Sequence, residues 1–366
     1  MKQELKIKIE NIICNNSNAD EKEIIFQLKQ LLYEAELQNS IVKDSKCIAD
    51  LVSESVNQLK SNSQNNNTIK SGFADFYKMF GGFGLGEFIV IGGRTAMGKT
   101  QLLVNLSLNI SQTIPVLYFT FDLSEFLLTS RFIASVSGIP ASNILQHDLT
   151  DEEKNKLSLV ESKLNKHKLF INDSCNNSFT AFKAHCQQQI ERNGVKVIFI
   201  DYLQMMSSSK YRNHRELEIS YISRELKNIA KDLNVCVIAT SQLSRAVESR
   251  FGSKHPQLSD LRESGAIEQN ADKVIFIYRP EYYGLEYDDE GNNTAGLAEI
   301  ILAKNRNGSL GSIKLLSDNY FTNFRSFDSY KKDFSFSQNR LDEMTAKNSN
   351  MKNLLGNLDL ESETPF

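Results

Sequence analysis

The sequence predicts an α/β fold, in which a largely parallel, twisted sheet is flanked by helices on both faces. Six apolar runs alternate with segments of helical periodicity, which is the rhythm of strand–helix–strand units. The runs lie at residues 88–91, 116–121, 169–171, 195–200, 235–239 and 274–278. Continuous apolar strands of this kind are typical of a sheet that is covered on both faces. The clearest predicted helix spans residues 219–233, where apolar residues recur on one face.

The stretch EFIVIGGRTAMGKT at residues 87–100 joins the first apolar run to the spacing Gly93-x-x-x-x-Gly98-Lys99-Thr100. In such a loop, backbone N–H groups converge on phosphate oxygens, the lysine reaches the β- and γ-phosphates, and the threonine hydroxyl binds Mg²⁺. Residues 101–110 are predicted to form a helix whose positive N-terminal end faces the same phosphates. The expected nucleotide-binding residues are Gly93, Arg94, Thr95, Ala96, Met97, Gly98, Lys99 and Thr100.

Polar side chains close three of the predicted strands. Asp201 ends the run VIFID and is the expected Mg²⁺-associated carboxylate, with a turn or helix N-cap role as the alternative. Asp122 follows VLYFTF and is the expected base that orients an attacking water, with Glu125 as the alternative. Gln242 follows VCVIATS and is expected to sense a γ-phosphate. Ligands gather at the carboxyl ends of parallel strands, so these residues predict a hydrolase site beside the glycine-rich loop.

Composition sets limits on the kind of protein. The chain has 366 residues, of which 40% are hydrophobic and 24% charged, and its net charge of −3 gives no bulk attraction to nucleic acid. No apolar run approaches the length of a membrane span and the N-terminus lacks a signal-peptide core, so we expect a cytoplasmic protein without membrane contact. Metal-ligand spacing is absent among the five cysteines, so free thiols and no structural metal are expected.

The sequence suggests four segments. Residues 1–46 hold short helical stretches, and residues 47–70 form an amphipathic helix followed by the polar linker SNSQNNNT. The apolar stripe of that helix, at residues 47–59, packs either on its own chain or on a neighbouring subunit. Residues 71–330 form the α/β domain and include a hairpin, in which runs at residues 298–304 and 312–316 flank the turn NRNGSLG. Residues 331–366 are polar and are expected to be disordered.

Four stretches carry a resemblance to a known family. They are IDYLQMM, SQLSRAVESR, LSDLRESGAIEQNADKVIFIYR and AEIILAKNRNGSLG. They resemble the motifs of bacterial replicative DNA helicases of the DnaB type, which have a RecA-like P-loop ATPase core. The resemblance covers residues 71–327 and, more weakly, the helix at residues 47–59. It implies a homohexameric ring that encircles single-stranded DNA, moves 5′ to 3′, unwinds duplex DNA during replication, and binds ATP with Mg²⁺ between its subunits.

The resemblance also implies roles for individual residues. Lys304 and Arg306 match positions that act in trans, the arginine as a finger on the next subunit's γ-phosphate; a solvated hairpin charge is the alternative for Arg306. The DNA-contacting loop of the family maps onto Arg262, Glu263 and Gly265. The loop residues at 93–100 and the metal-associated Asp201 keep the roles already expected from their chemistry.

The sequence departs from the family at two places. Asp122 stands where the family usually has glutamate, which predicts slower hydrolysis. The region before residue 47 is shorter than the family's helical domain, so a primase contact is doubtful, while a helicase loader is an implied partner. The alternatives to a helicase are a RecA-like ATP-binding scaffold and a repair ATPase with weak hydrolysis; a small-metabolite P-loop kinase has less support, because no acceptor site is evident.

Overall fold

The computed structural model describes residues 47–60, 68–174, 177–211, 214–250, 254–261, 265–287, 291, 293–318, 320 and 322–327, together with a few single residues before residue 47. The chain divides into two compact units, Met1–Asn65 and Asn66–Phe366. The helices expected within residues 1–46, the tail at residues 331–366, and both Arg262 and Glu263 lie outside the described residues. The division at residues 46, 70 and 330 stays a prediction.

In the first unit, the amphipathic helix expected at residues 47–59 is α3 (Ile48–Lys60). Its apolar residues Ile48 and Val52 are 72% and 51% exposed, and Val56 is also exposed. The sequence left open whether this stripe packs on its own chain or on a neighbour, and that question stays open.

The second unit is built on a sheet whose strand order, in the described part of the chain, is β11-β10-β9-β8-β3-β7-β6-β4-β5. The predicted strands are confirmed, with ends that differ by at most three residues, as is the predicted hairpin of β9 and β10. Strands β3 to β8 pair in parallel with one another, whereas the pairs β8–β9, β9–β10 and β10–β11 are antiparallel. The strands are β3 (Phe88–Gly93), β4 (Val116–Thr120), β5 (Leu169–Asn172), β6 (Val197–Asp201), β7 (Cys236–Gln242), β8 (Lys273–Tyr278), β9 (Leu297–Asn305), β10 (Gly311–Ser317) and β11 (Phe324–Ser326); β1 (Thr68–Ile69) and β2 (Phe83–Gly84) form a separate pair.

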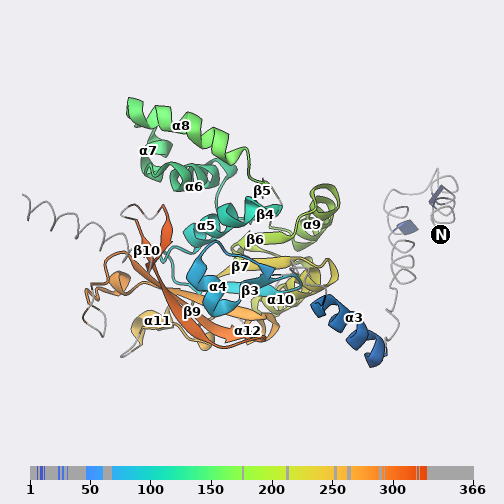
Figure 1. Cartoon of the computed structure of the whole chain (residues 1–366). Coiled ribbons are helices and arrows are strands. Elements are labelled where there is room, and N and C mark those ends of the chain that lie inside the picture. The colour runs from blue at the N-terminus through green and yellow to red at the C-terminus, as the bar shows by residue number, and fades with distance from the viewer. Residues whose placement is uncertain are drawn as a thin grey trace, which may run out of the picture. The chain divides into compact units, whose positions relative to one another are not determined.

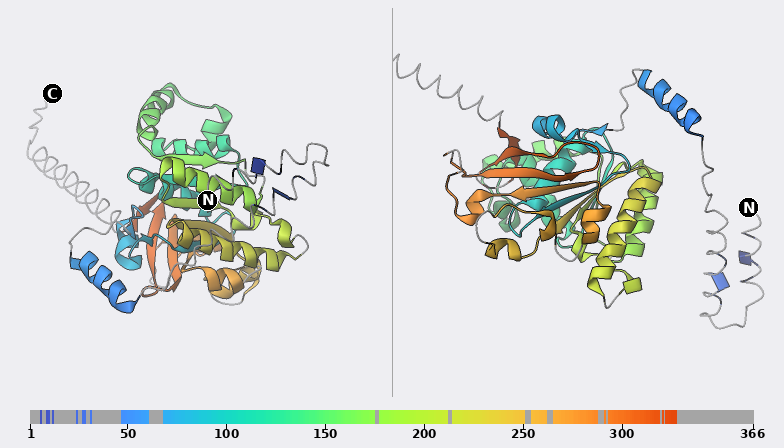
Figure 2. Two further views of the ribbon diagram at one scale, coloured as in Figure 1. Left: turned by 90° about the vertical axis from the view of Figure 1, so that its right-hand side faces the viewer. Right: turned by 90° about the horizontal axis from the view of Figure 1, so that it is seen from below.

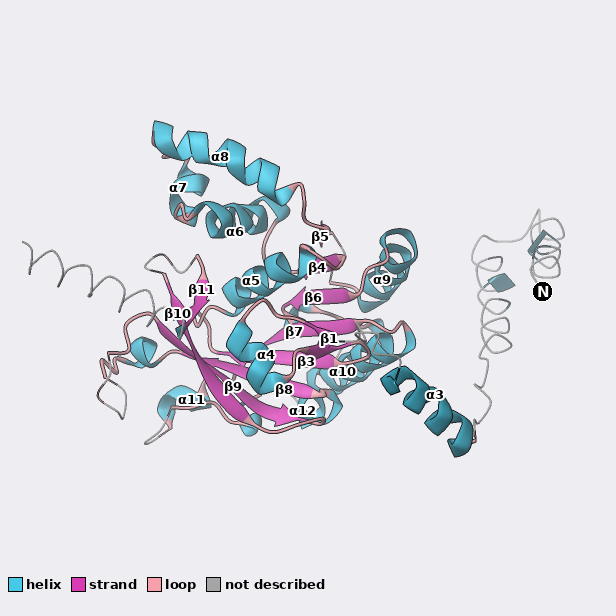
Figure 3. Ribbon diagram, viewed as in Figure 1, coloured by secondary structure: helices cyan, strands magenta, loops and turns pink. Residues whose placement is uncertain are grey.

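Helices cover both faces of this sheet, as Figures 1 and 2 show. Helices α4 and α5 pack on one face and α9 and α10 on the other. Three helices, α6 to α8, come between β4 and β5 and stand to one side of the sheet (Figure 3). The helices are α4 (Ala74–Phe80), α5 (Lys99–Ser111), α6 (Glu125–Ser137), α7 (Ala141–Gln146), α8 (Asp151–Leu164), α9 (Phe179–Asn193), α10 (Arg215–Asp232), α11 (Ala246–Ser249) and α12 (Gly265–Asn270), with short 3₁₀ turns at Leu203–Met205, Ser209–Tyr211, Leu258–Asp260 and Pro280–Tyr283.

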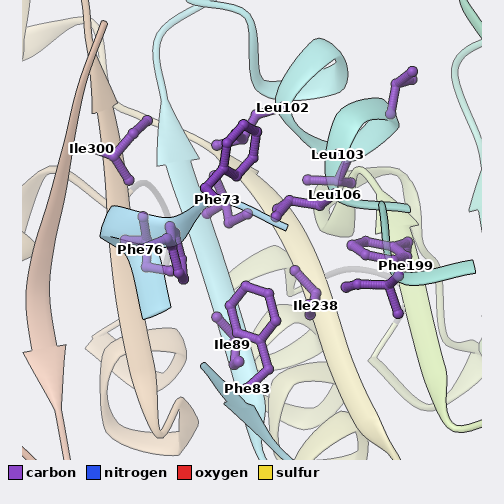
Figure 4. Close-up of a cluster of buried hydrophobic side chains, with 14 of the residues drawn as sticks. Phe73, Phe76, Phe83, Ile89, Leu102, Leu103, Leu106, Phe199, Ile238 and Ile300 are labelled. Atoms are coloured by element: carbon purple, nitrogen blue, oxygen red, sulfur yellow. The ribbon is translucent and has the colours of Figure 1, made fainter. Parts of the chain in front are cut away.

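The core has one apolar layer on each face of the sheet. Alternate residues of β3 point to opposite layers: Ile89 and Ile91 pack with α4 and α5, whereas Phe88 and Val90 pack on the side of α10. Figure 4 shows the first layer, where Leu102, Leu103 and Leu106 of α5 lie over the sheet. Burial of both faces explains why the strands read as continuous apolar runs. Within the described ranges, no helix combines the length and hydrophobicity that a bilayer-spanning segment requires.

We expect Leu103→Ala to lower the free energy of unfolding by about 2 to 5 kcal/mol, because it removes a fully buried side chain and leaves a cavity against the sheet. Urea unfolding followed by circular dichroism measures this change. Leu159→Ala on α8 is the matched control, since Leu159 is 62% exposed. Equal losses from the two substitutions would contradict this description of the core.

Candidate nucleotide-binding site

The glycine-rich loop joins the end of β3 to the first residue of α5, as its motif predicts. Two of its glycines are required by the backbone. A Cβ on Gly93 would lie 2.6 Å from the side chain of Ile277, and Gly98 has a φ of +93°, which side chains disfavour. These glycines let the loop turn tightly, with the N-terminal end of α5 directly behind it.

Lys99 is the cation of this loop. Its Nζ donates a hydrogen bond to the backbone oxygen of Arg94 at 2.9 Å. Burial lowers the pKa of Lys99 from 10.5 to about 8; the negative charge of Asp201 opposes this shift and the positive charge of Arg94 adds to it. The lysine is therefore an incompletely solvated cation, which a phosphate would stabilise.

Two side chains expected to bind the nucleotide point elsewhere. Met97 is 1% exposed and belongs to the apolar core. The guanidinium of Arg94 donates to Glu248 Oε1 at 2.7 Å and to the backbone oxygen of Leu243 at 2.8 Å. Arg94 and Met97 can therefore offer the site only their backbone groups, whereas Thr95 and Ala96 are exposed at the tip of the loop.

Asp201 ends β6 beside the loop and is 4% exposed. Its two carboxylate oxygens accept hydrogen bonds from the hydroxyls of Thr240, at 2.7 Å, and Tyr118, at 3.3 Å. Burial raises the pKa of Tyr118 and the charge of Asp201 raises it further, so the phenol keeps its proton and remains a donor. Among its described contacts, the Asp201 side chain caps no helix, which is evidence against its alternative role as a turn or N-cap aspartate.

Gln242 ends β7, and its side chain donates to the hydroxyl of Thr95 in the loop at 2.7 Å. Gln204 contacts the end of β7 at two points. Its amide oxygen accepts from the backbone N–H of Gln242 at 3.2 Å, and its amide nitrogen donates to Ser241 Oγ at 2.8 Å. The sequence analysis quoted Gln204 within IDYLQMM but gave it no role. Only its contacts across 37 and 38 residues of sequence reveal that it orients the end of β7.

A cavity of about 500 Å³ opens in front of the loop, within the usual size range of ligand sites. Asp122 is exposed at this cavity, whereas Glu125, its alternative, is not among the lining residues. Arg131 and Arg279 also line the cavity and were missed from the sequence. Arg279 directly follows β8, so strand-end reasoning could have found it, but Arg131 lies in α6 with no recognisable signal. The lining residues are Thr95, Ala96, Gly98, Lys99, Thr100, Gln101, Asp122, Arg131, Asp201, Tyr202, Gln242 and Arg279.

Lys304 and Arg306 lie toward the opposite end of the strands from the loop, near the start of β3. Lys304 pairs with Val274 of β8, which pairs with Val90 of β3. From Lys304 the chain continues away from the loop. The backbone N–H of Arg306 bonds to the oxygen of Asp272, whose own N–H bonds to Phe88 at the start of β3. A six-residue strand spans about 20 Å. Arg306 therefore cannot contact a phosphate bound to the loop of its own chain.

These two cations are held by neighbours. Lys304 donates to the backbone oxygens of Glu268 and Gln269 at the C-terminal end of α12, and Arg306 also donates to Gln269. Burial lowers the pKa of Lys304, and the charge of Arg306 adds to that effect. Arg306 also forms an ion pair with Asp272 at 3.3 Å while 45% of its side chain is exposed. It is a partnered side chain on the surface, which differs from the simple solvated charge that was its alternative.

The expected DNA-contacting residues are described only in part. Gly265 is the first residue of α12, while Arg262 and Glu263 fall outside the described residues. Arg250, which precedes this loop in the sequence, forms an ion pair with the buried Asp260 and donates to the backbone oxygen of His255. Its charge is therefore partly neutralised within the chain.

Comparison with known proteins identifies the fold and the family. Residues 68–326 match the family model described as the DnaB-like helicase C terminal domain. The replicative DNA helicase DnaB of Rickettsia typhi is 34% identical over 346 residues, covering 86% of this chain and 69% of that protein. The replicative DNA helicase DnaC of Bacillus subtilis is 36% identical over 265 residues, covering 72% and 57%. The chain thus spans between 57% and 69% of the length of these two relatives.

A solved structure described as a DnaB-like replicative helicase and its interactions with primase superposes with a TM-score of 0.72. The two are 31% identical, and the match covers 88% of this chain and 75% of that one. At this similarity, the largely parallel sheet with its glycine-rich loop is the RecA-like ATPase core of such helicases. Since the family match extends over most of the residues that the structure describes, the chain belongs to the DnaB-like helicase family.

Proposed function

We propose that this chain is an ATP-driven replicative DNA helicase that works as a homohexameric ring on single-stranded DNA and moves 5′ to 3′. The observation that carries the proposal is the distance between the phosphate loop and Arg306 within one chain. Lys99 and Asp201 lie at the carboxyl edge of the sheet, while Arg306 lies at the amino edge. A second copy of the chain can supply the arginine that the first copy cannot, which is the arrangement of a ring or filament.

The oxygen donors beside the loop fit Mg²⁺. The hydroxyl of Thr100 and the carboxylate of Asp201 line the same cavity, and hard oxygen ligands of this kind suit that ion. Once bound with ATP, Mg²⁺ would neutralise charge between the β- and γ-phosphates. Tyr118 and Thr240 would keep the carboxylate oriented through their hydrogen bonds to it.

The other residues of the cavity would divide the remaining work. Lys99 would bind the γ-phosphate, and Asp122 would orient the attacking water. Gln242 would exchange its bond to Thr95 for one to the γ-phosphate and so sense whether ATP is present. Arg306 of a neighbouring copy would stabilise the charge that develops in the transition state, since its planar fork of donors matches phosphate oxygens.

DNA contact is assigned to the residues that match the family's DNA loop, Arg262, Glu263 and Gly265. Contacts to phosphates fix the position of a strand without reading its sequence, which suits a motor that must move along any DNA. The relatives are named as replicative helicases and one solved neighbour was studied with primase, so a helicase loader and a primase are partners to test.

An ATP-binding scaffold with weak turnover is the second candidate. The exposed carboxylate of Asp122, one methylene shorter than glutamate, favours it. The two candidates differ in one measurement. A helicase hydrolyses ATP faster when single-stranded DNA is added and displaces a strand, whereas a scaffold binds ATP and assembles without either response.

We expect single-stranded DNA to stimulate ATP hydrolysis and Lys99→Ala to abolish it, because the substitution removes the cation that holds the γ-phosphate.

Arg306→Ala should lower kcat by about 10³- to 10⁵-fold with nearly unchanged ATP binding, because an arginine finger acts mainly in the transition state. A coupled phosphate-release assay measures both. Full activity of either variant would show that the residue is not used.

ATP affinity should fall as the pH rises. In the free protein the pKa of Lys99 is lowered to about 8, so the ammonium that binds phosphate is present below this pH and is lost above it. We expect the Kd of a fluorescent, non-hydrolysable ATP analogue to rise roughly 5- to 10-fold between pH 7.5 and pH 9. Lys99→Arg is the control, since its charge is permanent and its Kd should stay flat. A flat wild-type profile would mean that Lys99 remains charged.

Asp122→Asn should lower kcat by about 10²- to 10⁴-fold, since an amide cannot act as a base. Asp122→Glu should not reduce kcat, because the longer carboxylate reaches the same water. Steady-state ATPase kinetics with saturating DNA compare the two variants. A large loss in Asp122→Glu would show that this site is fitted to the shorter acid.

A further inference from the structure

We propose that Asp272 is a positioning residue for ATP hydrolysis, which acts in trans by holding the guanidinium of Arg306 toward the neighbouring subunit's nucleotide. This inference rests on the proposed function, because it assumes that Arg306 completes a site on another copy. Asp272 lies at the amino edge of the sheet and, like Arg306, is far from the phosphate loop of its own chain.

The contacts between the two residues involve both backbone and side chain. The backbone N–H of Arg306 donates to the backbone oxygen of Asp272 at 3.0 Å. Arg306 Nη1 approaches Asp272 Oδ1 at 3.3 Å, and Nη2 donates to the backbone oxygen of Gln269. The guanidinium is thus held at two of its nitrogens, while 45% of the side chain stays exposed. A fork fixed in this way can still present N–H groups outward.

Asp272 can act as a fixed point because the fold immobilises it. Only 8% of its side chain is exposed. Its Oδ2 accepts from the backbone N–H of Phe88 at 2.8 Å and from Lys227 Nζ at 2.7 Å. Lys227 also donates to the backbone oxygen of Gly86, so the carboxylate ties β3, α10 and the β9–β10 hairpin together. The other oxygen, Oδ1, faces Arg306.

Asp272→Asn removes the negative charge and keeps the size and shape of the side chain. Its amide oxygen could still accept from both Phe88 and Lys227, and its N–H₂ group would then face the guanidinium of Arg306, donor to donor. The backbone bond from Arg306 would remain. The substitution therefore removes the contact at Nη1, so that only the bond from Nη2 to Gln269 holds the guanidinium, while it leaves the path of the hairpin in place.

A misplaced finger should slow the chemical step without weakening ATP binding. An error of about 1 Å in a catalytic group can cost about 100-fold in rate. We therefore expect Asp272→Asn to lower kcat by about 10- to 100-fold and to leave the KM for ATP within about twofold. A role confined to stability would lower the melting temperature and leave kcat per folded protein unchanged.

Subunit mixing tests the action in trans. A ring of Asp272→Asn chains has intact loops and displaced fingers, whereas a ring of Lys99→Ala chains has intact fingers and defective loops. In a mixed ring, a loop from the first variant can meet a finger from the second. When the two variants are mixed in equal amounts, half of the loops and half of the fingers are intact, so about one interface in four has both. We therefore expect about a quarter of the wild-type ATPase rate, measured without DNA.

One control pair and one control variant make the outcome decisive. Arg306→Ala mixed with Lys99→Ala must also regain activity, and if it does not, the trans site of the proposed function is wrong. If that pair recovers and Asp272→Asn does not, the positioning role is wrong. Glu87→Gln removes another buried carboxylate at the same edge, which pairs with Lys273 at 2.7 Å, and it should keep the wild-type kcat.

Should Asp272→Asn not fold, Asp272→Glu keeps the charge and moves it by one methylene. We expect this variant to have an intermediate kcat and the same recovery on mixing with Lys99→Ala. A wild-type kcat for either folded Asp272 variant would overturn the proposal.

Discussion

The hydrogen-bonded register of β3 is the constraint on which the rest of the second unit depends. This strand pairs in parallel with β7 on one side and β8 on the other, and both of its faces are buried. The register brings the ends of β3, β6 and β7 together, so that Lys99, Asp201 and Gln242 line one cavity. At its other end, β3 bonds to Asp272 and thereby fixes the surface that carries Arg306. One strand thus sets the positions of the loop residues and of Arg306, the two halves of the proposed intersubunit site.

Most of the sheet could be predicted because its strands are buried on both faces and appear as unbroken apolar runs. The phosphate loop and the hairpin were equally accessible, since glycine spacing and an Asn-Gly turn are local signals. The sequence did not reveal that the side chains of Arg94 and Met97 point away from the loop, because a motif gives position and not direction. Gln204 and Arg131 were missed for a related reason: their roles depend on contacts between segments far apart in the sequence.

The charged groups of this protein are compensated by their immediate neighbours and not by the overall net charge. The net charge of −3 says little about where phosphate binds, whereas the burial of Lys99 creates a cation with unmet solvation. At the other edge, Asp272 compensates Lys227 and Arg306, and Glu87 compensates Lys273. The carboxylates of these pairs are buried, and an ion pair with a buried member adds little net stability. The proposed hydrolysis of ATP between subunits requires such a fixed placement of Arg306.

Helix α12 has only six residues and therefore measures about 9 Å. Its first residue, Gly265, belongs to the stretch that matches the family's DNA loop, and its last carbonyl groups hold Lys304 and Arg306. A helix this short is too stiff to absorb strain between its ends. In the proposed motor, a displacement of the DNA loop would therefore reach Lys304 and Arg306 across less than two turns of helix. Such a short path would couple movement along DNA to ATP hydrolysis on the adjoining copy.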